Sequence, residues 1–188
     1  MGNGGFDPLT FTVIRFVGAT PILFLMLYAL EKNIRIQLKD CWELALLGLI
    51  GVTIYQTLFM ASVKYATATN ASLMLAVSPV FTAIFAWLAG QERLGSWGRR
   101  GSALSLLGVL FVLLFGTNKL AVGWDVMRGN LIGILASSVW GLYPVLAKRM
   151  LRKYSALKTI TYSSLFGMIF LLVVGSKGEI SCQIMKNR

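Results

Sequence analysis

The ionisable side chains of this 188-residue chain provide little material for catalysis. Histidine is absent, which excludes a Ser-His-Asp triad, a histidine-bearing zinc site and imidazole acid–base chemistry. The carboxylates all fall near the ends of apolar stretches or in the gaps between them, at Asp7, Glu31, Asp40, Glu43, Glu92, Asp125 and Glu179. We therefore expect neither an enzyme nor a resident cofactor or metal.

Arg15 differs from the other charged residues because it lies well inside an apolar stretch. Eight residues separate it from Asp7, which is about 12 Å along a helix. Its helical neighbours, Thr12 and Gly18 among them, are mostly small or polar. Arg15 therefore either lines a polar cavity and attracts an anionic or carbonyl-bearing group, or it extends to the outer membrane surface or pairs with backbone carbonyls freed by proline.

The other candidates for a substrate cavity are polar or amphipathic residues within apolar stretches. Such groups seek hydrogen bonds, so packing between helices is the alternative to substrate contact. Pro79 joins them because proline in a helix frees the carbonyl four residues earlier, here that of Leu75. Carriers expose backbone groups in this way, although membrane helices also tolerate proline without such a role. The full set is Arg15, Tyr55, Gln56, Asn70, Ser78, Pro79, Trp140 and Tyr143.

Six apolar stretches hold these candidates, near residues 8–30, 42–63, 68–89, 102–117, 129–147 and 157–175. A helix of roughly 20 apolar residues crosses about 30 Å of hydrocarbon. The composition agrees, with 56% hydrophobic residues, a mean hydropathy of +0.72 and only 13% charged residues, against about 25% charged in soluble domains. The sequence predicts an all-α, polytopic transmembrane helix bundle of about six spans, with the lipid bilayer as its partner.

The net charge is +11, and the distribution of the basic residues along the chain predicts which side of the membrane each gap faces. Basic residues gather in alternate gaps between the stretches rather than on one face or tail, which argues against nucleic-acid binding. By the positive-inside rule, the gaps around residues 32–39, 93–100 and 148–158 face the cytoplasm, so the N-terminus lies outside. Within the second of these gaps, Glu92 stands beside Arg93, and we expect an ion pair that stabilises the loop.

Small residues predict where helices approach closely. Ala68, Ser72 and Ala76 are spaced by four in the third stretch, and Gly129 and Gly133 repeat this spacing in the fifth. Such faces allow close packing in lipid, where packing rather than the hydrophobic effect drives association. The second and third stretches are joined by only a few residues, so we expect them to be antiparallel neighbours.

Specific strings resemble the EamA domain of the drug/metabolite transporter superfamily. ASVKYATATNASL at 61–73, SPVFTAIFA at 78–86 and QERL at 91–94 are similar to the third and fourth helices of that domain, and Arg15-Phe16 resembles an arginine-aromatic pair in its second helix. Residues 129–148 resemble the opening helix of the family's second repeat. The resemblance covers nearly everything up to Gly175.

The resemblance implies an architecture that this chain contains only in part. Family members typically have ten helices in two inverted five-helix repeats, and this chain resembles helices two to seven. Residues 1–127 would be a first repeat lacking its opening helix, and residues 128–188 the start of a truncated second repeat. We therefore expect a fragment with partial inverted repeats.

Two functions remain open on these grounds. The first is a plasma-membrane carrier, or secondary transporter, that moves a small organic metabolite by alternating access. The second is a non-transporting membrane fragment or a helper subunit of an incomplete transporter. Formation of a homo-oligomer could complete the bundle in either case.

Overall fold

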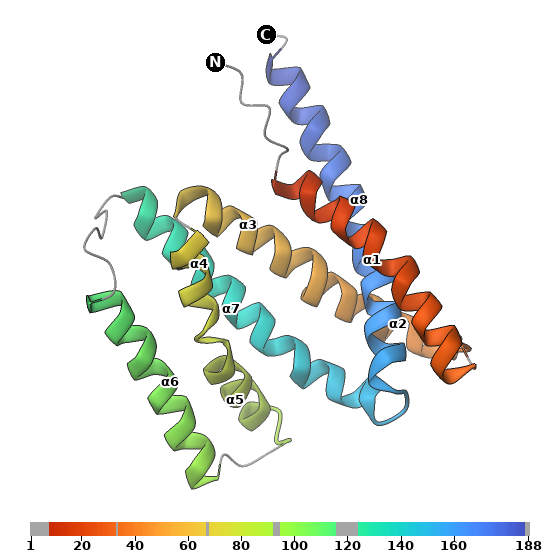
Figure 1. The fold of residues 1–188 in the computed structure, drawn as a ribbon, viewed down its shortest axis with the longest axis horizontal. Helices are drawn as coiled ribbons and strands as arrows, with labels where there is room; N and C mark the ends of the chain where they lie inside the picture. The colour runs from red at the N-terminus through yellow and green to blue at the C-terminus, as the bar shows by residue number, and fades with distance from the viewer. Residues whose placement is uncertain (1–7, 33, 67, 92–94, 116–123, 187–188) are drawn as a thin grey trace. The chain divides into compact units, whose positions relative to one another are not determined.

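The computed structural model describes residues 8–32, 34–66, 68–91, 95–115 and 124–186, and their regular structure is entirely helical (Figure 1). The all-α prediction is confirmed. The elements in chain order are α1 (Pro8–Glu31), α2 (Leu38–Gly48), the π-helix η1 (Leu49–Ile54), α3 (Tyr55–Tyr65), α4 (Ala68–Leu75), α5 (Ser78–Leu88), α6 (Ser96–Phe115), α7 (Trp124–Leu151) and α8 (Ala156–Lys186).

Several segments of the described chain are long and apolar enough to cross a membrane. These five are Thr12–Glu31, Leu38–Tyr65, Thr69–Leu88, Trp124–Leu151 and Ala156–Val173. They coincide with five of the six predicted stretches. The remaining stretch, 102–117, begins within α6, and its last two residues lie outside the described part of the chain.

One compact unit consists of Met1–Thr53 and Arg149–Arg188. Its α8 contacts both α1 and α2, and the blue ribbon of α8 runs beside the red ribbon of α1 in Figure 1. Fully buried leucines fill the contacts, namely Leu27 of α1, Leu44 of α2 and Leu171 of α8. On α8 the other buried side chains are mostly small and polar, namely Thr159, Thr161, Ser163 and Ser164.

Two glycines let α8 cross α2 and η1 at backbone distance. A Cβ atom on Gly48 would lie 2.3 Å from the Ser163 carbonyl oxygen, and one on Gly167 would lie 2.4 Å from Cβ of Val52. The Thr53 hydroxyl donates a hydrogen bond to the Gly167 carbonyl across the same crossing, at 3.1 Å. No residue larger than glycine fits at either position without moving a helix.

The second apolar stretch is not the uninterrupted α-helix that its composition suggests. Six residues, Leu49–Ile54, form π-helix between α2 and α3. The π-turns include Val52 and Thr53, which contact Gly167. The change of helix type therefore lies at the crossing with α8.

The second compact unit consists of Ile54–Lys148. Within it α3 contacts α4, as the short connection predicted, and α5 contacts α6. Gly129 of α7 approaches Ala66, where an added Cβ would meet the alanine Cβ at 2.7 Å, and Gly133 approaches Ser62 and Met74. The predicted close approach at Gly129 and Gly133 is confirmed.

The small-residue face predicted for the third stretch is wrong. Ser72 and Ala76 are exposed, whereas Ala71 and Met74 are 1% and 4% exposed. The reason is that α7 already supplies the small residues, Gly133 above all, and Met74 fills the space opposite it. A small residue on one helix permits a large one on its neighbour.

The helix ends differ from the sequence-based boundaries at two places. The first helix begins at Pro8, as predicted, with Asp7 outside the described residues. The second begins at Leu38 rather than at Trp42, since an extended Gln37 precedes it and Asp40 in its first turn complements the helix dipole. The last helix continues through Lys186, well past the predicted end near residue 175.

Candidate functional site

Aromatic rings from α3 and α7 form a cluster within the second unit, consisting of Tyr55, Phe59, Trp140 and Tyr143. The Tyr55 and Trp140 ring centroids lie 4.6 Å apart. Trp140 stacks on Tyr143 at 5.8 Å with an interplanar angle of 7°, and Tyr55 stacks on Phe59 at 5.9 Å. Tyr55 is buried, but Trp140 is 40% exposed. The cluster therefore presents part of a stacked aromatic surface.

A glycine beside Trp140 brings the first turn of α5 against α7. A Cβ atom on Gly141 would lie 2.8 Å from Cβ of Phe81 and 2.9 Å from the Ser78 carbonyl oxygen. Ser78 accepts a hydrogen bond from the Thr82 hydroxyl at 3.1 Å. The predicted candidates Ser78 and Pro79 thus lie on the turn that contacts α7 next to the aromatic cluster.

The third stretch breaks where Pro79 predicts a break, but a different carbonyl is engaged there. Helix α4 ends at Leu75 and α5 begins at Ser78. The sequence pointed to the Leu75 carbonyl, whereas the structure has the buried Ser137 hydroxyl donating to the Met74 carbonyl at 2.5 Å. The Val77 amide donates to the same oxygen at 3.1 Å. The break is therefore stabilised by a side chain of α7.

Replacing Ser137 with alanine should lower the stability of the folded chain by about 1 kcal/mol, since it removes a buried hydrogen bond between helices. Ser138→Ala is the matched control, because the Ser138 hydroxyl donates to the Leu135 carbonyl of its own helix, at 2.8 Å. Thermal unfolding in detergent compares the two variants. Equal effects would show that the bond to Met74 does not hold the break.

The remaining predicted candidates lie in different places. Gln56, next to Tyr55, is buried, and Asn70 on α4 is partly buried. Arg15 belongs to the other compact unit, where it is exposed on α1 with its guanidinium carbon 5.4 Å from the centre of the Phe16 ring. The predicted loop residue Glu92 lies outside the described residues. The structure thus gathers Tyr55, Trp140 and Tyr143 in one cluster, beside the turn that carries Ser78 and Pro79.

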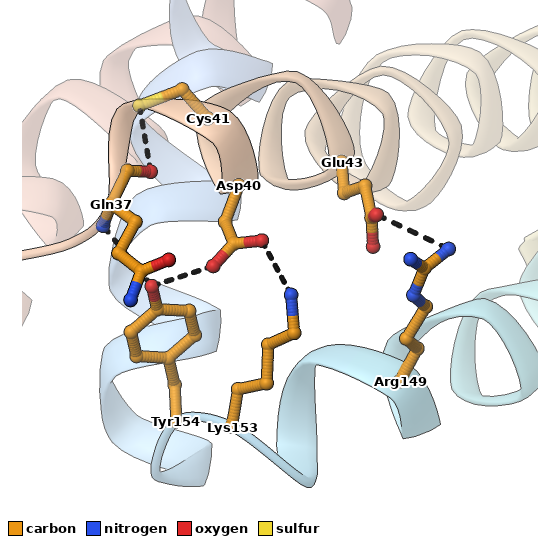
Figure 2. A network of polar contacts seen from close by, with 7 residues as sticks. All are labelled: Gln37, Asp40, Cys41, Glu43, Arg149, Lys153 and Tyr154. Carbon is orange, nitrogen blue, oxygen red and sulfur yellow. Dashed lines mark hydrogen bonds and ion pairs between the residues drawn. The ribbon is translucent and has the colours of Figure 1, made fainter.

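A second polar site lies in the first unit and was not predicted from the sequence (Figure 2). The Asp40 carboxylate, only 4% exposed, accepts a hydrogen bond from Lys153 Nζ at 2.7 Å and one from the Tyr154 hydroxyl at 2.7 Å. The Tyr154 oxygen in turn accepts the Gln37 backbone amide at 3.1 Å. The connection between α7 and α8 is thereby attached to the start of α2.

Further ionic contacts join the same parts of the chain. An Arg149 guanidinium nitrogen lies 3.3 Å from the Glu43 carboxylate, and Lys158 Nζ lies 3.7 Å from that of Glu31. Ser155 also donates to Glu31. The ion pair of Asp40 and Lys153 is the third of this kind. We call the three pairs, Asp40–Lys153, Glu43–Arg149 and Glu31–Lys158, the ionic clamp. Each joins a carboxylate within residues 31–43 to a base within residues 149–158.

The pKa of the Tyr154 phenol is raised above its ordinary value. The hydrogen bond from the Gln37 amide lowers it, but the bond to the Asp40 carboxylate and burial favour the neutral phenol and outweigh that effect. Tyr154 therefore keeps its proton at physiological pH and donates to Asp40. The stabilisation from this bond is complete below pH about 10 and is lost as the pH rises past the raised pKa.

The aromatic cluster could bind a ligand, and the ionic clamp holds helices together, but neither has the residues of a known catalytic site. In the described residues no group of histidine, cysteine, aspartate and glutamate side chains could hold a metal ion. The aromatic cluster provides faces for stacking or for a cation. In the ionic clamp each carboxylate is paired with a lysine or arginine of the same unit.

Comparison with known family models and with curated proteins points to one family of transporters. The model of the EamA-like transporter family matches residues 1–114 and 127–183, eight residues beyond the predicted end of the resemblance at Gly175. The chain is 28% identical over 172 residues to the uncharacterized transporter YyaM of Bacillus subtilis, covering 91% of this chain and 56% of that protein. No solved structure matches.

Other relatives carry similar names. The chain is 31% identical over 173 residues to the uncharacterized transporter YdfC of Bacillus subtilis, covering 92% of this chain and 55% of that protein. It is 29% identical over 137 residues to a probable terminal-alkyne amino-acid exporter of Streptantibioticus cattleyicolor, covering 71% of this chain and 43% of that protein. The chain spans about half the length of the curated relatives it matches. Its apolar helices and the extent of the family match show that it is a multi-pass membrane protein belonging to the EamA-like transporter family.

Proposed function

We propose that this chain is an integral membrane carrier that moves a small organic metabolite by alternating access and has no catalytic activity. The observation that carries the proposal is the aromatic cluster of Tyr55, Trp140 and Tyr143, in which the Trp140 ring is 40% exposed within a membrane-crossing helix. An exposed indole flanked by two phenol rings offers a flat face to an organic solute. The family match supplies the transport context.

The proposed substrate is a molecule about the size of an amino acid. One relative is named as a probable exporter of a terminal-alkyne amino acid, which supports this size class. Ser78, Gln56 and Asn70 of the same unit would contribute hydrogen bonds to the substrate. A polar set of this kind selects a solute with both an organic body and polar ends.

Alternating access requires segments that move as separate bodies, and the break between α4 and α5 supports this requirement. Pro79 occupies the first turn of α5, where proline is tolerated because its missing N–H needs no partner. The two short helices meet at Ala76 and Val77, and a change in their relative angle would rearrange only the few hydrogen bonds of this turn, such as that from the Val77 amide to the Met74 carbonyl. We propose that this joint adjusts when substrate binds beside Gly141.

We further propose that the carrier resides in the plasma membrane with its N-terminus outside. The support is the distribution of basic residues, which are numerous in alternate gaps and sparse in the others. The ionic clamp would then lie at the cytoplasmic end of the first unit. The division into repeats at residues 127 and 128 remains a prediction of the family resemblance.

Transport by the purified chain in liposomes tests the proposal. A panel of radiolabelled amino acids and small organic acids should include at least one that the chain moves faster than empty vesicles do. Trp140→Ala should raise the KM for that solute about tenfold, because it removes the ring that stacks on Tyr143 and contacts Tyr55. Trp124→Ala is the matched control, since Trp124 begins the same helix and is largely exposed.

Two outcomes would contradict the proposal. Folded, inserted chain that moves no member of the panel would favour the alternative of a non-transporting segment or helper subunit. Equal KM changes in Trp140→Ala and Trp124→Ala would remove the aromatic cluster from the transport path. Circular dichroism and size-exclusion profiles of each variant establish that the fold is intact.

A further inference from the structure

The ionic clamp leaves an imbalance of charge at its end of the first unit. Residues 31–43 and 149–158 contain seven lysines and arginines but only three carboxylates, Glu31, Asp40 and Glu43. Each of these carboxylates is already engaged by a base of the clamp, at 3.7, 2.7 and 3.3 Å respectively. All three carboxylates within these two ranges are therefore already paired with a base of the clamp.

Two of the other bases adjoin the central ion pair of the clamp in sequence. Lys39 directly precedes Asp40, and Arg152 directly precedes Lys153, and the side chains of Asp40 and Lys153 form the 2.7 Å ion pair. The side chains of Lys39 and Arg152 are exposed, and neither makes an ion pair within the described part of the chain. Exposed bases without a carboxylate partner attract an anion such as a lipid headgroup.

Exposed apolar groups lie beside these bases. Trp42, 76% exposed, is three residues after Lys39 and on the same face of α2, and Leu46 continues that face one turn further. The end of α1 repeats the pattern, with exposed Tyr28 one turn before exposed Lys32. A basic head with an aromatic ring one turn deeper is typical of the boundary between lipid headgroups and acyl chains.

We infer that Lys39 and Arg152 bind the phosphate of an anionic phospholipid such as phosphatidylglycerol, with Trp42 against the upper part of its acyl chains. The arginine supplies two parallel donors to phosphate oxygens and the lysine a point charge. Because the ion pair of Asp40 and Lys153 fixes the backbone that carries both residues, binding has to order only the two side chains. A soluble phosphate would lack the contact with Trp42 and Leu46.

Lipid binding to the purified full chain tests this inference without reference to transport. Native mass spectrometry and thermal unfolding compare phosphatidylglycerol with zwitterionic phosphatidylcholine in the same detergent. Lys39→Gln with Arg152→Gln should weaken phosphatidylglycerol binding by roughly 30-fold and abolish the rise in thermal midpoint that it causes. Binding of phosphatidylcholine should not change.

The matched control is Lys64→Gln with Arg128→Gln, which also removes one lysine and one arginine, both exposed and both in the other unit. It should bind phosphatidylglycerol like the native chain, as should the charge-preserving exchange Lys39→Arg with Arg152→Lys within a fewfold. Equal losses in the two glutamine double variants would overturn the inference. Full competition by glycerol phosphate would also overturn it, because it would assign the site to a soluble anion.

Discussion

Alanine at Gly48 or Gly167 is expected to lower the stability of the first unit more than any other single methyl addition in the described chain. The new Cβ would lie 2.3 Å from the Ser163 carbonyl oxygen in one case and 2.4 Å from Cβ of Val52 in the other. The first contact is with backbone and the second with a β-branched residue that cannot rotate away. Separating the helices would also lengthen the 3.1 Å bond from Thr53 to Gly167. We expect a loss of about 1–3 kcal/mol, or more, for each variant.

Thermal unfolding in detergent measures this effect, and Gly18→Ala provides the matched control. Gly18 lies in α1 of the same unit, and no atom lies within 4 Å of a Cβ added there. Alanine favours a helix relative to glycine, so Gly18→Ala should be neutral or mildly stabilising. If Gly48→Ala and Gly167→Ala unfold at the same temperature as Gly18→Ala, then α8 does not cross α2 at backbone distance.

Asp40→Ala should produce the second large effect, a drop of several degrees in the thermal midpoint together with faster thiol labelling of Cys41. Asp40 is the most buried carboxylate of the clamp and accepts from both Lys153 and Tyr154. Its removal leaves Lys153 without its partner and releases the connection between α7 and α8 from α2. Cys41, the next residue, then becomes more accessible to a maleimide.

The control for this prediction lies in the same clamp. Glu43 pairs with Arg149 at 3.3 Å, but that arginine side chain is 71% exposed. Exposed pairs contribute little, so Glu43→Gln should leave the thermal midpoint nearly unchanged. The exchange Asp40→Lys with Lys153→Asp should recover part of the stability lost in Asp40→Ala. If Glu43→Gln and Asp40→Ala lower the thermal midpoint equally, then Asp40 is not the residue on which the stability of the clamp mainly depends.

The helical architecture could be predicted from the sequence because its signals are local. Apolar runs of membrane length predicted five segments that are helical in the structure, and Pro8 marked the start of the first helix. Gly129 and Gly133 indicated close packing because only glycine allows a helix to approach so near. These features depend on residue size, polarity and short spacing alone.

The π-turns and the ionic clamp could not be predicted, because they depend on contacts between distant residues. Asp40 and Lys153 are 113 positions apart, and in the sequence each is simply a charge in a gap between apolar runs. The same is true of the contact between Gly48 and Gly167. Gly48 lies in a stretch with no small-residue repeat as clear as that of Ala68, Ser72 and Ala76, of which the structure leaves Ser72 and Ala76 exposed.

The residues of the candidate site could be predicted from the sequence, but their arrangement in space could not. Tyr55, Trp140 and Tyr143 were identified as amphipathic residues within apolar stretches, and the structure brings their rings together. The sequence carried no sign that the Trp140 ring would contact both of the others, since Tyr55 comes from a different helix. Likewise, Pro79 indicated a break in its helix, but only the fold of α7 shows that Ser137 engages the Met74 carbonyl.

Cysteine labelling from the two sides of the membrane tests most directly whether the helices cross the bilayer with the predicted sidedness. In a background where Cys41 and Cys182 are replaced by serine, Gly95→Cys and Trp124→Cys place single thiols in successive connections between apolar stretches. We expect a membrane-impermeant maleimide to label Trp124→Cys in intact cells, and Gly95→Cys only after permeabilisation. Labelling of both in intact cells, the reverse pattern, or recovery of the chain in the soluble fraction would contradict a multi-pass carrier of this orientation.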